Sequence, residues 1–295
     1  MRFGITFPQN EIGTDPAAIR DYGQTAEGGG FDYLVAFDHV LGAHPDRFAG
    51  VDVGFPAPPY THTNQFHEVF ALFSFLAGLT SRIEFTTSIL ILPQRQTALV
   101  AKQAAQVSLL SGGRFRMGVG IGWNFTEFEG LNENFHNRGR RVEEQITVLR
   151  KLWTETLVTF EGRWHHFDRV GIAPLPSHPI PVWMGGGTSD RLIQRVARFA
   201  DGWMPGMQLS DDTANVLGRM HAALEAEGRD PATFGLQVGL SATTGGPADW
   251  SATARRWRSL GATHLGVRAG TPGMSPMQSL EKAIEVRTML AEEIG

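Results

Sequence analysis

The chain alternates strand-like and helix-like segments eight times, and this alternation restricts its possible folds more than any other feature. Each strand-like segment is a short apolar run, typical of a strand that is buried on both faces. Each is followed by a segment with apolar residues at helical spacing. The alternation therefore predicts a parallel sheet covered by helices. The expected strands are 2–7, 31–37, 83–92, 115–121, 181–184, 202–204, 234–240 and 263–267.

Eight such units in 295 residues predict a closed (β/α)8 TIM barrel, with residues 1–295 as a single domain. The alternative is an open doubly wound sheet with a Gly-x-Gly-x-x-Gly turn. The glycines Gly118-x-Gly120-x-Gly122 have a different spacing, and Trp123-Asn124 is not expected to begin a helix. We therefore reject a dinucleotide-binding fingerprint and favour the barrel.

The same three glycines leave one face of the fourth expected strand without side chains. Two interpretations follow from this spacing. Either a neighbouring segment packs tightly against the strand, or a flat ligand lies against its backbone. The spacing alone does not decide between them.

Two segments interrupt the alternation. Residues 40–62 form a long loop rich in proline and glycine, and loops of this length in a compact domain often act as lids. Residues 155–180 contain two short strand patterns around Glu161-Gly162, which predict a hairpin excursion from the barrel.

Composition excludes several classes of function. The chain has no cysteine, which excludes disulfides, thiolate catalysis and iron–sulfur clusters. Its formal net charge is −4 and it has no basic run, so no nucleic-acid partner is expected. The longest apolar run, 69–79, is too short to span a membrane. Because a strand pattern begins at Arg2, we expect no signal peptide and a cytoplasmic location.

The loops that follow the strands of a barrel form its site, and this rule selects residues 38–39, 88–93, 122–124, 185–188, 205–206, 241–243 and 268–270. Asp38-His39 ends the second expected strand, and a histidine there can accept or donate a proton. The alternative is a loop-capping Asp and a packed His. Residues 185–188 precede a helix, where free backbone N–H groups favour an anion. An ordinary helix start with Thr188 or Ser189 as the cap is equally compatible with the pattern.

The central glycines belong to a longer motif, Leu-Ser-Gly-Gly-Arg-Phe-Arg-Met-Gly-Val-Gly-Ile-Gly-Trp-Asn at 110–124. Glu127-Phe128 and then Phe135-His136-x-Arg138-x-x-Arg141-x-x-Glu144 follow it. These motifs resemble the luciferase-like monooxygenase family, and most closely its branch that uses the deazaflavin coenzyme F420. The resemblance extends over nearly the whole chain.

The resemblance implies a set of site residues. Asp38 and His39 would be the catalytic pair, with Asp38 also supporting the loop or the cofactor. A non-proline cis peptide is common in relatives at the stretch that lies against the cofactor ring, and Gly185 to Thr188 would hold the cofactor phosphate. Trp123 stands where the sugar-phosphate dehydrogenases of the family carry Glu, so an acidic partner for His39 is missing there. The implied cofactor-binding residues are Asp38, Thr87, Ser88, Ile89, Gly122, Trp123, Asn124, Gly185, Gly186, Gly187 and Thr188.

The expected function is an F420-dependent oxidoreductase that transfers a hydride between the deazaflavin C5 and a small organic substrate. The resemblance also implies a homodimer. The alternatives are an FMN-dependent monooxygenase or reductase, a non-catalytic flavin-binding barrel, and a metal-dependent hydrolase with Asp38 and His39 as ligands. We expect no structural metal, because the histidine spacings fit no common zinc pattern.

Overall fold

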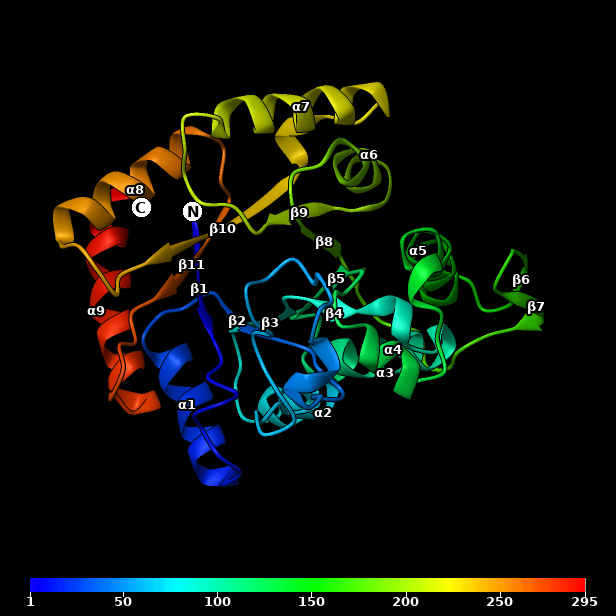
Figure 1. Cartoon of the computed structure of the whole chain (residues 1–295), viewed down its shortest axis with the longest axis horizontal. Coiled ribbons are helices and arrows are strands. Elements are labelled where there is room, and N and C mark those ends of the chain that lie inside the picture. The colour runs from blue at the N-terminus through cyan, green and yellow to red at the C-terminus, as the bar shows by residue number, and fades with distance from the viewer. Residues whose placement is uncertain (295) are drawn as a thin grey trace.

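The computed structural model describes residues 1–294, and its centre is a closed barrel of eight parallel strand positions (Figure 1). The strands are ordered β3-β2-β1-β11-β10-β9-β8-β5, and β5 pairs with β3 to close the ring, while the short β4 extends the β3 position. The eight expected strands are all present. The strands are β1 (Arg2–Thr6), β2 (Tyr33–Ala36), β3 (Glu84–Thr87), β4 (Leu90–Ile91), β5 (Phe115–Gly120), β8 (Val182–Gly186), β9 (Gly202–Pro205), β10 (Gly235–Ser241) and β11 (His264–Arg268).

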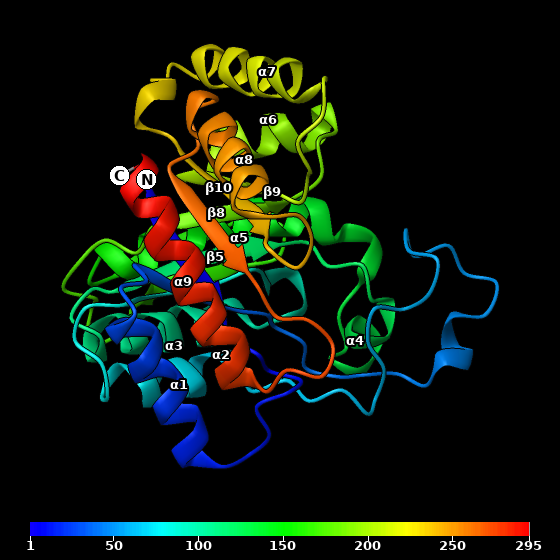
Figure 2. The same cartoon turned by 90° about the vertical axis from the view of Figure 1, so that its left-hand side faces the viewer.

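Helices surround the strands, and α1 lies beside α9 on the outside of the barrel (Figure 2). Their starts follow local chemistry: Asp15 accepts a hydrogen bond from the N–H of Ala17 at 2.9 Å, and Pro16 takes the first position of α1. The α-helices are α1 (Pro16–Gly28), α2 (Val69–Ala77), α3 (Thr97–Leu110), α4 (Phe125–Gly130), α5 (Arg138–Thr154), α6 (Asp190–Phe199), α7 (Thr213–Ala226), α8 (Pro247–Ser259) and α9 (Pro276–Ile294). The short 3-10 helices are Pro45–Phe48, Leu92–Gln94, Phe135–Asn137 and Pro231–Thr233. Within residues 1–294, no helix has both the length and the apolar character needed to cross a membrane.

The expectation that no helix begins at Trp123-Asn124 was wrong, because α4 begins directly after these two residues. Asn124 is the N-cap of α4, and its side-chain oxygen accepts from the N–H of Thr126 at 3.0 Å. Asparagine suits this position because its short side chain replaces a missing helical partner. The rejection of a dinucleotide fold still stands on the glycine spacing and on the closed barrel.

A charged layer fills the barrel at the amino-terminal ends of its strands. Arg116 is buried there, donates to Glu84 at 2.8 Å and to Gln237 at 3.0 Å, and lies 4.1 Å from the Trp183 ring centre. Burial, with Arg116 nearby, lowers the pKa of His264 to about 2, so this histidine is neutral. A functional site must therefore lie at the opposite end, where the strands release their carboxyl-terminal loops.

The bare glycine face of β5 is filled by the protein itself. A Cβ on Gly118 would lie 2.0 Å from the carbonyl oxygen of Thr87, and one on Gly120 would lie 1.7 Å from the Cδ1 of Ile89. Of the two interpretations that the spacing left open, tight packing by a neighbouring segment therefore accounts for both positions. Gly239, on the inner side of β10, is different: a Cβ there would meet no atom within 4 Å.

This contrast gives a prediction for two glycine-to-alanine variants. Gly118→Ala should lower the free energy of unfolding by about 1–3 kcal/mol, because its new methyl group meets a backbone oxygen that can move only with β3. Gly239→Ala is the matched control and should leave stability nearly unchanged. Chemical denaturation of both variants measures the difference, and equal stability of the two would contradict the packing.

Two segments leave the barrel pattern. Between α5 and β8, β6 (Val158–Glu161) and β7 (His166–Val170) form an antiparallel hairpin that projects beyond α5 (Figure 1). Glu144 of α5 accepts from three backbone N–H groups of the hairpin turn and contacts the Nδ1 of His165 at 2.7 Å. The other segment, residues 40–62, runs out beside α4 (Figure 2), and Phe48 packs against Phe125 of that helix.

Candidate active site

His39 lies just beyond the carboxyl end of β2, at the mouth of the barrel. Its Nδ1 is 3.3 Å from the Oε2 of Glu127, and its ring packs on Tyr60 at 3.9 Å and Phe66 at 4.8 Å between centroids. The side chain keeps 17% of its surface exposed. Within residues 1–294 its Nε2 forms no hydrogen bond, so the nitrogen opposite Glu127 is free to meet a ligand.

Glu127 of α4 is fully buried, and its carboxylate collects four contacts. Oε1 accepts from the N–H groups of Val40 at 2.6 Å and Leu41 at 3.2 Å, and Oε2 accepts from the Tyr60 hydroxyl at 2.9 Å and contacts His39. Burial opposes ionisation, but the bond to His39 and the two N–H bonds outweigh it and hold the pKa of Glu127 below its usual range. Glu127 is therefore a carboxylate.

An ionised carboxylate can only accept hydrogen bonds, so the proton must lie on the Nδ1 of His39. Neutral imidazole then presents Nε2 as an acceptor, which is the arrangement of a general base. If His39 takes up a second proton, Glu127 stabilises the resulting positive charge. The pair therefore fixes both the orientation and the chemistry of the exposed nitrogen.

Glu127 also joins the two ends of the 40–62 loop. Val40 and Leu41 begin the loop, and Tyr60 near its end receives a second hydrogen bond of 2.6 Å from the Asn124 amide. Burial and the adjacent Glu127 raise the pKa of Tyr60, so its hydroxyl stays protonated and donates. Trp123 packs beneath the same loop, 5.7 Å from Phe48 and 5.4 Å from Phe55 between ring centres.

Asp38 points away from His39. Its carboxylate receives two bonds from Arg95, at 2.6 and 3.2 Å, and one from the N–H of Ile91 at 3.1 Å. Adjacent residues at the end of a strand point in opposite directions, which explains the separation. Asp38 ties the end of β2 to the segment after β4, a supporting position.

The pKa of Glu127 predicts how stability depends on pH. A carboxyl group with a lowered folded-state pKa stabilises the fold fully above its unfolded pKa, about 4.3 for Glu, and loses that contribution as the pH falls through the folded value. At neutral pH, Glu127→Gln should cost about 1–3 kcal/mol of stability, because a buried acceptor is lost.

The same variant should lose stability less steeply than the native protein as the pH falls below about 4.3. Glu27, Glu84 and Glu144 also have lowered pKa values, but they are present in both proteins and cancel in the comparison. Urea unfolding of both proteins from pH 7 to pH 3 provides the measurement. Parallel curves would mean that Glu127 is not ionised in the folded protein.

The segment after β3 forms a wall of the mouth. The peptide bond between Ser88 and Ile89 is cis, and the Thr87 hydroxyl donates to the Gly118 carbonyl at 2.6 Å. Positions for a Cβ on Gly120 and Gly185 both lie within 2.5 Å of Ile89 side-chain atoms. Ile89 therefore covers the ends of two strands, and Thr87 uses its hydroxyl within the protein.

This geometry joins a carboxylate-oriented histidine, a cis-peptide wall and a closed parallel barrel, and the family comparison agrees with it. The model of the luciferase-like monooxygenase family matches residues 1–272. The chain belongs to this family. It is accordingly an oxidoreductase or monooxygenase.

Relatives of this luciferase-like protein include an uncharacterized protein of Mycobacterium tuberculosis (strain H37Rv), 31% identical over 76% of this chain and 77% of that protein. The F420-dependent hydroxymycolic acid dehydrogenase of the same strain is 26% identical over 86% of this chain and 66% of that protein. The structure of an F420-dependent secondary alcohol dehydrogenase in complex with an F420–acetone adduct has a TM-score of 0.78 over 98% of both chains at 16% identity, a likeness of fold.

The loop from Gly185 to Ser189 precedes α6 at another part of the mouth. Within residues 1–294, the N–H groups of Gly187, Thr188 and Ser189 form no hydrogen bond. Arg219 of α7 supports the loop from below, donating to the Thr188 carbonyl at 3.1 Å and pairing with Asp190. The free N–H groups at a helix start suit an anion.

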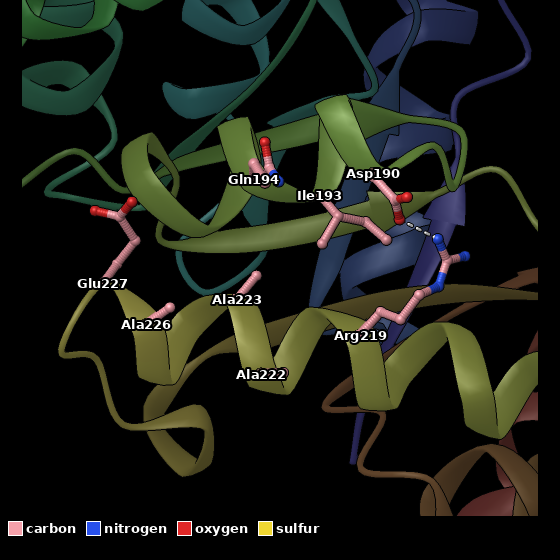
Figure 3. Close-up of a pocket in the computed structure, with 8 residues that line it drawn as sticks. All are labelled: Asp190, Ile193, Gln194, Arg219, Ala222, Ala223, Ala226 and Glu227. Carbon is pink, nitrogen blue, oxygen red and sulfur yellow. Dashed lines mark hydrogen bonds and ion pairs between the residues drawn. The ribbon is translucent and has the colours of Figure 1, made fainter.

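A cavity of about 460 Å³ lies between α6 and α7. Figure 3 shows the Asp190–Arg219 pair at one end of its lining and Glu227 at the other. Its floor consists of small side chains such as Ala223 and Ala226. The cavity lies among the outer helices, and it meets the candidate site only through Asp190 and Arg219, which support the Gly185–Ser189 loop.

Two other expected site residues, Gly122 and Asn124, make contacts within the protein. Gly122 has a φ of 70°, in the left-handed region that favours glycine, and its carbonyl accepts from Arg138 at 3.2 Å. Asn124 uses its amide on Tyr60 and its oxygen on α4. The roles of Glu127, Tyr60 and Arg95 were not predicted from the sequence. The acidic partner that Trp123 does not supply is Glu127, four residues later in the motif.

Proposed function

We propose that this luciferase-like protein is an F420-dependent oxidoreductase that transfers a hydride between the deazaflavin C5 and a small organic substrate. The observation that carries the proposal is the Glu127–His39 pair, which presents a free imidazole nitrogen at the barrel mouth. Two of the similar proteins, one relative and one structural neighbour, are F420-dependent dehydrogenases, which supports the choice of cofactor.

The residues of the mouth fit such a cofactor. The free N–H groups of Gly187, Thr188 and Ser189 would hold its phosphate. The wall formed by Ser88 and Ile89 offers a surface against which a planar ring would lie. When bound, F420 supplies a carbon that accepts or donates a hydride.

In the direction of substrate oxidation, the substrate carbon loses a hydride while Nε2 of His39 takes the proton from the attached hydroxyl or amine. Glu127 stabilises the imidazolium that forms. In the reverse direction His39 returns the proton. The 40–62 loop, held over Trp123 by aromatic contacts, would shield this step from water.

The structure offers little support for a metal-dependent hydrolase at this position. Both oxygens of Asp38 are engaged by Arg95 and Ile91, and His39 faces Glu127 instead. A metal held by Asp38 and His39 together would have to break the buried Arg95 pair, which disfavours that alternative.

Turnover tests the proposal directly. The purified protein is incubated under anaerobic conditions with reduced F420 and a panel of ketones, imines and enones, and the oxidised deazaflavin absorbance is followed. A parallel series uses reduced FMN with oxygen. We expect turnover only with F420. Turnover only with FMN would place the protein with the FMN-dependent monooxygenases, and binding without turnover in either series would indicate a non-catalytic cofactor protein.

A substitution in the Gly185–Ser189 loop tests the proposed phosphate site. A Cβ on Gly187 would meet no atom within 4 Å, whereas Gly186 has a φ of 147° and a Cβ there would meet Leu192. Gly187→Asp should therefore preserve the fold and weaken F420 binding by about tenfold or more, through repulsion of the phosphate. Gly187→Asn is the matched uncharged control. Equal affinity of the two variants for F420 would move the phosphate elsewhere.

A further inference from the structure

Arg268 is the last residue of β11 and occupies the inner side of the barrel mouth. It is in register with Ser241 of β10. It also lies on the same side of its strand as His264 and Gly266, which both adjoin Tyr33 inside the barrel. Because side chains alternate along a strand, the side chain of Arg268 leaves the backbone on the interior face of the barrel. Arg268 is exposed.

Open space lies below Arg268. Gly239 and Gly266 face each other across β10 and β11, so this part of the inner wall has no side chains. Gly239 is exposed although it lies in mid-strand, and a Cβ there would meet no atom within 4 Å. The buried ring of Tyr33 forms the floor, where it covers Gly4. The inner wall beneath Arg268 is therefore bare at Gly239.

Arg268 has no counter-ion within residues 1–294, and its side chain forms no hydrogen bond there. Other arginines near the mouth are engaged: Arg95 pairs with Asp38, Arg47 with Glu129, and Arg138 donates to backbone carbonyls. The adjoining strand ends, 6–9 and 241–243, carry no charged side chain. This part of the mouth therefore has an unbalanced positive charge above an open interior.

We infer that Arg268 recognises a carboxylate on the substrate, which makes the substrate class a small organic anion with an apolar body. The apolar part follows from Phe37, which stands at the same mouth with 41% of its surface exposed. An arginine fork binds a carboxylate through two parallel hydrogen bonds, which match the planar geometry of that group. The inference rests on the proposed function in placing the reaction at this mouth.

The cofactor phosphate is the competing anion, since the loops after the seventh and eighth strands of such barrels often hold phosphate. In this chain β10 and β11 are those strands. The phosphate is accounted for by the free N–H groups at Gly187 to Ser189, on the other side of β9, which leaves Arg268 for the substrate.

The experiment measures binding by calorimetry to the cofactor-free and the F420-loaded protein. The probes are acetate, butyrate and benzoate, each compared with its amide. The variants are Arg268→Gln, Arg268→Lys and, as a control, Arg256→Gln on the exposed face of α8. We expect the native protein to bind at least one carboxylate and not its amide, and Arg268→Gln to weaken that binding about 10- to 100-fold. Arg268→Lys should fall between them, and Arg256→Gln should match the native protein.

Three results would overturn the inference: no carboxylate binds, the Arg268→Gln and Arg256→Gln variants bind equally well, or Arg268→Gln weakens F420 binding and leaves the carboxylate unaffected. The last result would assign Arg268 to the cofactor phosphate. The F420 titration in the same series tests the proposed cofactor separately from the proposed carboxylate subsite. If carboxylate binding depends on Arg268 but F420 does not bind, the cofactor proposal is contradicted and the carboxylate subsite is retained.

Discussion

Replacing His39 with alanine is expected to lower turnover by about 10²–10⁴-fold, or about 3–5 kcal/mol of transition-state stabilisation. The reason is that Nε2 of His39 is the proton-transferring atom of the proposed reaction, with Glu127 holding the opposite nitrogen. The proposed cofactor contacts at Ser88-Ile89 and Gly187 are untouched, so the affinity for F420 should change little. Steady-state kinetics beside a binding titration of the same variant separates the two effects.

His62→Ala is the matched control for this variant. His62 is exposed in the same loop and stacks only on His44, so its removal should leave turnover within about twofold of the native protein. If His39→Ala retained turnover within a few-fold, His39 would be a packing residue against Tyr60 and Phe66. The proton would then come from solvent or from another group.

Replacing Arg95 with methionine is expected to lower the free energy of unfolding by about 3–5 kcal/mol. The Asp38 side chain is only 2% exposed and that of Arg95 13%, and three hydrogen bonds hold the carboxylate in place. Without Arg95, a buried charge keeps a single N–H partner. Guanidinium denaturation followed by tryptophan fluorescence measures the loss.

The double variant Asp38→Asn with Arg95→Met shows whether the loss comes from the unpaired charge. Because it removes both charges together, it should recover part of the stability that Arg95→Met loses. A double variant less stable than Arg95→Met would mean that Asp38 stabilises the fold independently of Arg95.

The barrel could be predicted from the sequence because each of its strands has a recognisable local pattern of residues. Each inner strand is a short apolar run, and helix starts such as Asp15-Pro16 carry their own capping signals. These signals act over a few residues, so a single sequence contains them. The β2 end at Asp38-His39 followed from the same logic, since barrel geometry brings every strand end to one face.

The partners within the site could not be predicted in this way, because they depend on contacts between distant segments. Glu127 meets His39 and Val40 only because the loop from 40 to 62 returns to α4, and no local pattern records that return. Arg95 meets Asp38 across 57 residues. One local signal was available for α4: Asn124 followed by the acidic Glu127 in the first turn resembles a helix start.

The glycines of β5 show the same limit. Their spacing correctly indicated that something lies close to the backbone. A ligand and a protein segment both require a residue without a side chain at such a position, so the spacing does not distinguish them. The occupants proved to be the Thr87 carbonyl and the Ile89 side chain, which come from the neighbouring strand position.

The central claim is that the barrel mouth of this luciferase-like protein binds F420 for hydride transfer, and the most direct test is a side-by-side titration of the purified protein with F420 and FMN. Quenching of tryptophan fluorescence follows binding, since Trp123 lies at the mouth. The account predicts that F420 saturates the protein at a lower concentration than FMN does, and that Gly187→Asp weakens F420 binding relative to Gly187→Asn. Equal affinity for the two cofactors, or saturation by FMN alone, would contradict it.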